Sequence, residues 1–418
     1  MERVILHSDL NNFYASVECL YHPELRNQPL VVGGDEDARH GIVLAKNQLA
    51  KAYGIKTGDV LWEARRKCPG LVSVPADFKR YLKFSMLVRK IYADYTDLIE
   101  PFGIDENWLD VTGSSRLFGS GAKIADEIRQ RVYDTLGVTV SVGVSFNKVF
   151  AKLGSDMKKP DATTLITKEN YPAAVWPLPA SDLLYVGRAT EKKLAAMGVH
   201  TIGELACCDV DLLHRWLGVW GLMLHRFANG EDHSPVARGE AESCIKSVGN
   251  STTAPRDLTS PEDVKAVFYM LAESVAARLR GYGLKCAGVQ ISLRDKDLIS
   301  CERQAKLEFP SSLTSEIAGK AMEIFTSEYR MEKALRSIGI RGINLVPENG
   351  TYQLNLFSDQ QWREKLADVE HAVDAIRDRF GYFAIQRGIL RKDPELTGIN
   401  PKDDHTIFPP GYLNGKVV

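Results

Sequence analysis

The sequence predicts a multidomain α+β protein, and three observations lead to that expectation. The chain has 418 residues, which is too long for one ordinary hydrophobic core and fits two to four domains. Residues 1–18 and 76–166 alternate strand and helix patterns in the order expected when helices pack on one face of a sheet. Residues 245–346 predict the order β-α-β-β-α-β, which is the split β-α-β unit.

Composition excludes several classes of protein. Hydrophobic residues make up 44% of the chain, enough for large cores, and the formal net charge of −1 argues against a uniformly basic nucleic-acid binder. The seven cysteines form no C-x-x-C pair, which favours reduced thiols over disulfides or a zinc module. The N-terminus leads directly into a strand, without a signal-peptide pattern, and no apolar run reaches transmembrane length. We therefore expect a cytoplasmic protein that does not enter a membrane.

The elements of the first 166 residues follow from local patterns. Residues 3–8 predict a strand that ends at Asp9, and a helix follows after an Asn cap. Two short strands at 29–34 and 41–44 and a helix at 45–54 predict a small subdomain. A helix over 77–97 carries apolar residues at helical spacing, which we assign to the core: Tyr81, Phe84, Val88, Ile91 and Tyr95. The region is completed by a helix over 115–136, a strand over 138–145 and a helix over 147–158.

Three carboxylates stand out in this region. Successive side chains of a strand point to opposite faces, so the neighbours Asp105 and Glu106 can converge only at a turn, which we expect to be a tight hairpin tip. Asp9 ends the opening strand and can meet that tip on the face of the sheet that the helices leave open. Clustered carboxylates suit hard cations such as Mg²⁺, in the two-ion arrangement used for phosphoryl transfer. The alternative interpretation is a polar hairpin with exposed acids.

Three motifs together carry a resemblance to a known family. The segments His7–Glu18 (HSDLNNFYASVE), Gly103–Asp110 (GIDENWLD) and Ser141–Lys148 (SVGVSFNK) resemble those of the Y-family translesion DNA polymerases in order and approximate spacing. The likeness covers about residues 1–346. It implies a right-hand polymerase with a palm at 1–18 and 76–166, fingers at 19–75, a thumb at 167–235, a linker at 236–244, a little finger at 245–346 and a tail at 347–418.

The resemblance also implies an activity and its partners. We expect error-prone DNA synthesis past damaged template bases, without proofreading, in DNA repair and the SOS response. The chain would act as a monomer on primer-template DNA and dNTPs, and it could meet other SOS factors. By resemblance, Asp9 and Asp105 bridge two Mg²⁺ ions, the Leu10 carbonyl is a backbone ligand, and Glu106 binds the catalytic ion and helps to position the primer 3′-hydroxyl.

The nucleotide-binding residues are also carried over by resemblance. Tyr14, which follows Phe13, matches the steric gate that excludes a ribose 2′-hydroxyl, although it could simply pack on the sheet. Lys159 matches a triphosphate-binding lysine, with a surface lysine at a helix end as the alternative. Gln48 and Lys51 stand where many relatives carry Tyr and Arg. Because lysine lacks the bidentate fork of arginine, Lys51 would contact the triphosphate as a point charge, and a solvated lysine face is the alternative.

Two later regions predict DNA contacts. Residues 181–194 resemble a helix-hairpin-helix in which the backbone at Gly187, Arg188 and Ala189 holds a DNA phosphate, although Ala189 replaces a common second glycine. The aromatic residues expected in the core of this domain are Trp216, Trp220 and Phe227. Residues 246–346 carry 15 Lys and Arg against 12 Asp and Glu, so this domain has a net charge of +3. We expect a sheet face here to bear the DNA-contacting arginines, any of which could instead be a solvated edge residue: Arg294, Arg303, Arg336 and Arg341.

The tail combines a short peptide with a helix. Gln353, Leu354, Leu356 and Phe357 resemble the peptide that binds the bacterial sliding clamp (β subunit), whose apolar pair would fill a pocket. Beyond it, residues 362–379 predict an amphipathic helix, and a proline-rich end follows. This long tail, and the Asp9-Leu10-Asn11 sequence where many relatives have a second Asp, favour the polymerase V branch over the polymerase IV branch.

Two other classes of protein remain to be weighed. A nucleotidyl cyclase could use paired acids on a palm, but it needs no grip on duplex DNA. A non-enzymatic DNA module bound to a clamp would have no reason to keep three acids together. Primer extension with magnesium separates these two classes from a polymerase.

Overall fold

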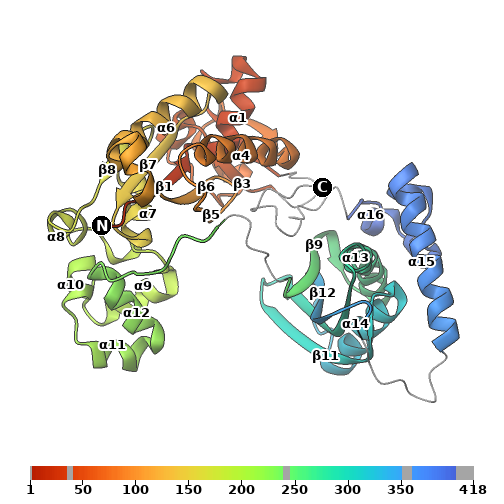
Figure 1. Cartoon of the computed structure of the whole chain (residues 1–418). Coiled ribbons are helices and arrows are strands. Elements are labelled where there is room, and N and C mark those ends of the chain that lie inside the picture. The colour runs from red at the N-terminus through yellow and green to blue at the C-terminus, as the bar shows by residue number, and fades with distance from the viewer. Residues whose placement is uncertain (1, 35–40, 239–244, 351–359, 402–418) are drawn as a thin grey trace. The chain divides into compact units, whose positions relative to one another are not determined.

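The computed structural model describes residues 2–34, 41–238, 245–350 and 360–401. They fall into two compact units, the first with residues 2–34 and 42–238 and the second with residues 245–350 and 360–401 (Figure 1). No helix in these ranges is both long and apolar enough to cross a bilayer.

The first unit is built around a five-stranded sheet in the order β5-β6-β1-β7-β8. The central strand β1 is antiparallel to both of its neighbours, and β7 and β8 are parallel. All six residues of β1 are buried, so both faces of the sheet must be covered. The strands are β1 (Ile5–Leu10), β5 (Ile99–Pro101), β6 (Glu106–Asp110), β7 (Val140–Ser145) and β8 (Thr163–Leu165).

Helices cover this sheet on both faces, not on one face as predicted. Helices α4 (Phe78–Ala93) and α6 (Gly121–Leu136) bury the face that carries Leu6. Helix α7 (Lys148–Met157) packs Ala151 against Ile5 on the opposite face. The approach is close because β7 has Gly143 there, where a Cβ atom would lie 1.9 Å from the Ala151 carbonyl oxygen. The acids therefore share their face of the sheet with α7.

Most predicted elements of this unit are confirmed, with shifted ends. The five aromatic and aliphatic residues assigned to the core of α4 and its C-terminal end are all buried. The helix predicted over 115–136 breaks at Gly119, whose φ of 93° separates α5 (Ser115–Phe118) from α6. Helix α1 (Phe13–Tyr21) does follow Asn12, but this residue has a left-handed φ of 49° and its side chain makes no capping hydrogen bond.

The region predicted as fingers has its own small sheet, in the order β3-β2-β4. Its elements are β2 (Leu30–Gly33), β3 (Val43–Lys46), α2 (Gln48–Ala52), α3 (Leu61–Lys67) and β4 (Val72–Pro75). The predicted helix over 45–54 is shorter because β2 pairs with β3 as far as Lys46. Asn47 then caps α2 by accepting a hydrogen bond from the backbone N–H of Ala50, so Lys46 lies on a strand and not on a helix.

The region predicted as the thumb is helical. Its helices are α8 (Tyr171–Val175), α9 (Arg188–Ala196), α10 (Ile202–Ala206), α11 (Val210–Leu217) and α12 (Val219–Ala228). Phe227 packs against the core, but Trp216 and Trp220 are 47% and 58% exposed, so their assignment to the core is wrong. Gly221 of α12 lies so close to Leu213 of α11 that a Cβ atom would meet the Leu213 carbonyl oxygen at 2.3 Å. This contact between the short helices leaves both tryptophans outside.

The second unit confirms the predicted β-α-β-β-α-β order. Its elements are β9 (Ser247–Leu258), α13 (Pro261–Gly281), β10 (Leu284–Asp295), β11 (Ser300–Ser311), α14 (Thr314–Glu328) and β12 (Leu335–Pro347). The strands form an antiparallel sheet in the order β11-β10-β12-β9. Both helices pack on the same face of this sheet around Phe268, Val289 and Ile317, which leaves the opposite face of the sheet uncovered by them.

The tail is folded onto this second unit. It contains α15 (Gln360–Phe380) and α16 (Pro394–Thr397), which lie beside α13 (Figure 1). Leu390 and Leu396 belong to the same hydrophobic core as α13 and the sheet. The predicted amphipathic helix over 362–379 is therefore confirmed, and the residues after it complete the packing of the domain.

Buried ion pairs hold α15 to α13. Arg280 of α13 is 7% exposed and reaches Asp374 at 2.6 Å and Glu370 at 3.2 Å. Glu273, which is 3% exposed, accepts a hydrogen bond of 2.9 Å from Arg377. Buried charges are tolerated only when each has a partner, so these residues fix the position of α15 on the unit.

Loss of one partner in this network should be costly. Arg280→Ala removes the ion pair of Asp374 and leaves Glu370 with Arg387 and Thr314 as its partners, and we expect a loss of about 2–4 kcal/mol in the free energy of unfolding. Lys320→Ala is the matched control, because Lys320 pairs with the exposed Glu323 within α14 and should cost less than about 1 kcal/mol. Denaturant unfolding of the full chain measures both values, and equal losses would contradict a role of the buried network in stability.

Candidate active site

The three predicted acids lie together at one end of the central strands. In the antiparallel register of β1 and β6, Asp9 lies opposite Glu106. The Leu10 N–H donates to the Asp105 carbonyl at 3.1 Å, which brings the turn beside the end of β1. The hairpin is closed by the Phe102 N–H, which donates to the Glu106 carbonyl at 2.9 Å. The hairpin is present, but its turn lies earlier than predicted: residues 102–105 form the bend, and Glu106 already belongs to β6.

Two lysines of the α7 region occupy the space among these acids. The Lys159 Nζ atom lies 2.7 Å from Asp9 Oδ2, and the Lys152 Nζ atom lies 2.7 Å from Glu106 Oε1. In the described ranges, no group of three His, Cys, Asp or Glu side chains is arranged to hold a metal ion. Each ammonium group instead lies within hydrogen-bond distance of a carboxylate oxygen of this cluster.

Burial makes the charged forms of these acids costly. It raises the pKa of Asp9 to about 7, aided by the hydrogen bond with Glu106 and opposed by the charge of Lys159. Burial also raises the pKa of Asp105 to about 6, with a further contribution from the charge of Asp9. A divalent cation favours the charged form of a carboxylate. The donor set therefore fits a hard cation, with carboxylate oxygens of Asp9, Asp105 and Glu106 as ligands.

His7 is a buried member of the site that sequence reasoning missed. Its Nδ1 atom lies 2.8 Å from the hydroxyl of Ser155. Its Nε2 atom has no hydrogen-bond partner and lies 3.9 Å from Glu106 Oε2. Burial lowers the pKa of His7 well below its ordinary value, and the charges of Lys152 and Lys159 lower it further. The only sequence signal was its alternation with Asp9 on β1, which places both on one face.

The predicted nucleotide-binding residues are only partly brought together. Tyr14 stacks on Tyr81 at 4.3 Å between ring centroids, and Phe13 is buried beside it. Lys159 reaches the acids, as described above. Gln48 and Lys51 are exposed on α2, and the structure does not place either side chain in contact with the acids. Their contacts with a nucleotide stay a prediction.

Only the second helix of the predicted helix-hairpin-helix is an α-helix, because the chain before it forms a short 3-10 turn at Ala180–Asp182. Gly187 is the N-cap of α9, and Arg188 and Ala189 begin the helix. All three are exposed, so the backbone N–H groups of the first turn are accessible to a phosphate. DNA binding by this turn stays a prediction.

The four predicted arginines of the second unit do not share a face. Arg294 and Arg341 lie on the face of the sheet away from α13 and α14, opposite Ser337 and Gln290 respectively. Arg303 lies opposite Ile291, which is buried under the helices, so its strand register places it on the helix side. Arg336 lies at an irregularity in the pairing of β12 with β9 and is half-buried. The expectation of one face with four arginines is therefore wrong.

The predicted clamp-binding residues Gln353, Leu354, Leu356 and Phe357 lie outside the described residues.

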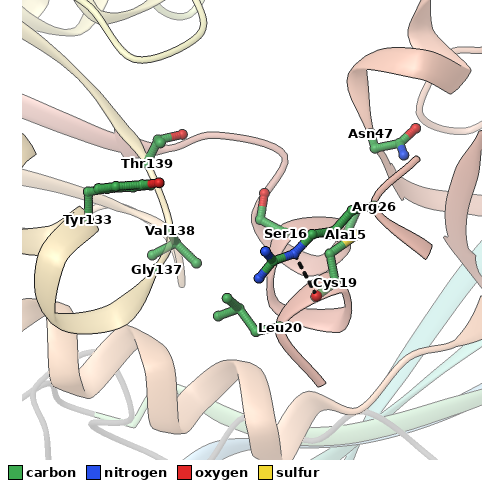
Figure 2. A pocket seen from close by; sticks show the side chains of 10 residues that line it. All are labelled: Ala15, Ser16, Cys19, Leu20, Arg26, Asn47, Tyr133, Gly137, Val138 and Thr139. Atoms are coloured by element: carbon green, nitrogen blue, oxygen red, sulfur yellow. Dashed lines mark hydrogen bonds between the residues drawn. The ribbon is translucent and has the colours of Figure 1, made fainter. Parts of the chain in front are cut away.

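A cavity of about 290 Å³ lies on a different part of the first unit. Figure 2 shows its lining, which comes from α1, the end of α6 with the residues that follow it, and the side chains of Arg26 and Asn47. Within it, the Arg26 Nε–H donates to the Cys19 carbonyl at 3.2 Å. None of the predicted site residues lines this cavity.

Comparisons with known proteins place the chain in a family. Residues 8–156 match the impB/mucB/samB family, residues 245–356 match the C-terminal domain of that family, and residues 181–232 match the thumb domain of DNA polymerase-iota. The chain is 57% identical over 399 residues to DNA polymerase IV of Acetivibrio thermocellus, covering 96% of this chain and 100% of that protein. It is 37% identical to DNA polymerase IV 1 of Bacillus subtilis, covering 94% of each chain.

A solved structure shares the fold. The Y-family DNA polymerase chimera Dbh-Dpo4(243-245)-Dbh matches with a TM-score of 0.73 and 22% identity, covering 82% of this chain and 99% of that one.

The chain therefore belongs to the Y-family DNA polymerases, which are DNA-directed DNA polymerases. The relatives reported above carry the name DNA polymerase IV. A match over 96% of the chain takes in most of the tail, so the preference for the polymerase V branch is not supported.

The pKa of Asp9 predicts how stability depends on pH in the absence of metal. A carboxyl with a raised pKa in the folded state stabilises the fold below its unfolded pKa, and that contribution is lost as pH rises through about 7. Asp9→Asn removes this loss. The unfolding free energy of the variant minus that of wild type should therefore increase by about 1–3 kcal/mol when the pH is raised from 5 to 8.

Denaturant unfolding in EDTA at the two pH values measures this gain. Asp211→Asn, at an exposed position of α11, is the control and should show no such trend. If the unfolding free energies of Asp9→Asn and wild type differed by the same amount at both pH values, a raised pKa of Asp9 would be contradicted.

Proposed function

We propose that this chain extends a DNA primer by adding deoxynucleotides from dNTPs to its 3′-hydroxyl, with two Mg²⁺ ions in the active site. The observation that carries the proposal is the convergence of Asp9, Asp105 and Glu106 at the end of β1 and β6. Their carboxylates, with the Leu10 carbonyl as a further ligand, suit hard cations. Bound there, two such ions would lower the pKa of the 3′-hydroxyl and neutralise charge on the α-phosphate.

The side chains of the site have distinct roles in the proposed reaction. Asp9 and Asp105 anchor the ions, and Glu106 orients the primer hydroxyl toward the α-phosphate. Lys159 releases Asp9 when the nucleotide binds. Its ammonium group then binds the triphosphate oxygens by charge attraction. Tyr14, supported by its stack on Tyr81, places a ring beneath the sugar and excludes a 2′-hydroxyl by steric clash.

The rest of the chain would grip DNA. We infer that the start of α9 at Gly187–Ala189 holds a DNA phosphate and that Arg294 and Arg341 contact phosphates from the open face of their sheet. Such contacts bind without reading sequence. The peptide Gln353–Phe357 would bind the bacterial sliding clamp and keep the enzyme on its template.

Translesion synthesis in the SOS response, without proofreading, is part of the proposal. The region predicted as fingers has a core of only a few buried side chains, such as Val31, Ile55 and Leu61. A small cover of this kind leaves room for a damaged template base. In the described ranges, the elements are accounted for by the polymerase parts and the tail, and none forms a nuclease domain of its own.

Removal of a proposed metal ligand should separate catalysis from DNA binding. Asp105→Asn and Glu106→Gln should each lower primer extension with Mg²⁺ by about 10³-fold, because the charge on the α-phosphate is then poorly stabilised. DNA affinity should stay within about twofold of wild type. Primer extension and an electrophoretic shift assay measure the two quantities, with Asp134→Asn as the control on α6. Loss of affinity in step with loss of extension would contradict the proposal.

The steric-gate role of Tyr14 is tested with ribonucleotides. Tyr14→Ala removes the ring beneath the sugar, and we expect incorporation of ribonucleotides relative to deoxynucleotides to rise by about 10²-fold or more. Single-nucleotide incorporation kinetics give the ratio. Tyr133→Ala, at a tyrosine that is 55% exposed on α6, should leave it unchanged. Unchanged sugar discrimination in Tyr14→Ala would rule out the gate.

A further inference from the structure

Helix α7 and the residues just after it carry three charged side chains near the catalytic acids: Lys152, Asp156 and Lys159. Lys152 Nζ lies 2.7 Å from Glu106 Oε1, 3.3 Å from Asp156 Oδ2 and 3.9 Å from Asp9 Oδ2. Lys159 Nζ lies 2.7 Å from Asp9 Oδ2 and 2.8 Å from Asp156 Oδ1. Asp156 thus holds both ammonium groups, one with each oxygen, and each ammonium group reaches a different catalytic acid.

The packing of α7 fixes the position of Lys152. The side chain of Lys152 is only 15% exposed. Helix α7, which carries it, packs closely on β7 at Gly143. The ammonium group of Lys152 is held by ion pairs with Glu106 and Asp156.

The two lysines differ in what they can reach. The function proposed above assigns Lys159 to the triphosphate. Lys152 instead faces carboxylates from three elements, Glu106 of β6, Asp156 of its own helix and Asp9 of β1, with the ring of Phe102 at 5.9 Å. No part of the proposed mechanism uses it. Its position suits a group that orients the carboxylate of Glu106 and neutralises the charge of that carboxylate until a cation binds.

We propose that Lys152, anchored by Asp156, is a positioning residue that holds Glu106 in place and competes with the divalent cation for its carboxylate. This inference rests on the proposed function of the three acids. Two effects of opposite sign follow. The positive charge of Lys152 weakens cation binding by Coulomb repulsion, whereas its hydrogen bond keeps Glu106 oriented for turnover.

The substitution Lys152→Gln separates these effects. In the full-length enzyme without DNA or dNTP, we expect Mn²⁺, followed by the electron paramagnetic resonance signal of the free ion, to bind about threefold or more tightly. The half-saturating Mg²⁺ concentration in primer extension should fall in parallel. The kcat at saturating Mg²⁺ should fall about tenfold, because Glu106 is no longer fixed. A residue with a merely structural role would not tighten Mn²⁺ binding.

Three further variants test the assignment. Lys152→Arg keeps the charge and should restore weak Mn²⁺ binding. Lys158→Gln removes the same charge at an exposed position of the same helix end and should behave as wild type. Asp156→Asn keeps both ammonium groups but loosens their anchor, so kcat should fall without tighter Mn²⁺ binding.

Unchanged or weaker Mn²⁺ binding in Lys152→Gln would overturn the inference, provided that its thermal unfolding matches wild type. A shift in unfolding is resolved by Lys152→Met, whose apolar chain fills the same buried space and must show the same tightening. These outcomes are distinct from failure of the proposed function, which would appear as primer extension that survives Asp105→Asn.

Discussion

The antiparallel register between β1 and β6 is the constraint on which the active site depends. It pairs five residues of each strand and places Asp9 opposite Glu106. A slip of one residue would turn every side chain of β1 to the other face of the sheet, carrying Asp9 into the core beneath α4 and α6. Buried side chains on both faces of β1 prevent such a slip, because Leu6 and Ile5 each fit a different helix layer. The hydrophobic pattern of one strand thus sets the geometry of a polar site.

Much of this arrangement could be predicted from local patterns. The acids, the hairpin between them and the order of elements in both units follow from alternation, helical spacing and turn residues, which act over a few positions. The β-α-β-β-α-β order is an example, since each of its elements is long and strongly periodic. The convergence of Asp9 with Glu106 required in addition the family motifs, because residues about a hundred positions apart are joined only by the pairing of strands.

What could not be predicted depends on tertiary packing. The sequence of α7 shows a lysine at position 152 among other charged residues, and only the packing of the folded chain brings that side chain to Glu106. Arg303 looked equivalent to Arg294, but strand register places the two on opposite faces. Trp216 and Trp220 have apolar rings suited to a core, yet the contact of Gly221 with Leu213 leaves no space inside.

The docked tail has a mechanical consequence. Gly350, which lies shortly after β12, and Gln360, at the start of α15, belong to the same compact unit, and the ion pairs of Arg280 and Glu273 hold α15 on that unit. A partner that binds the chain between these two points is therefore tethered on both sides to a single domain, the one built on α13 and its sheet.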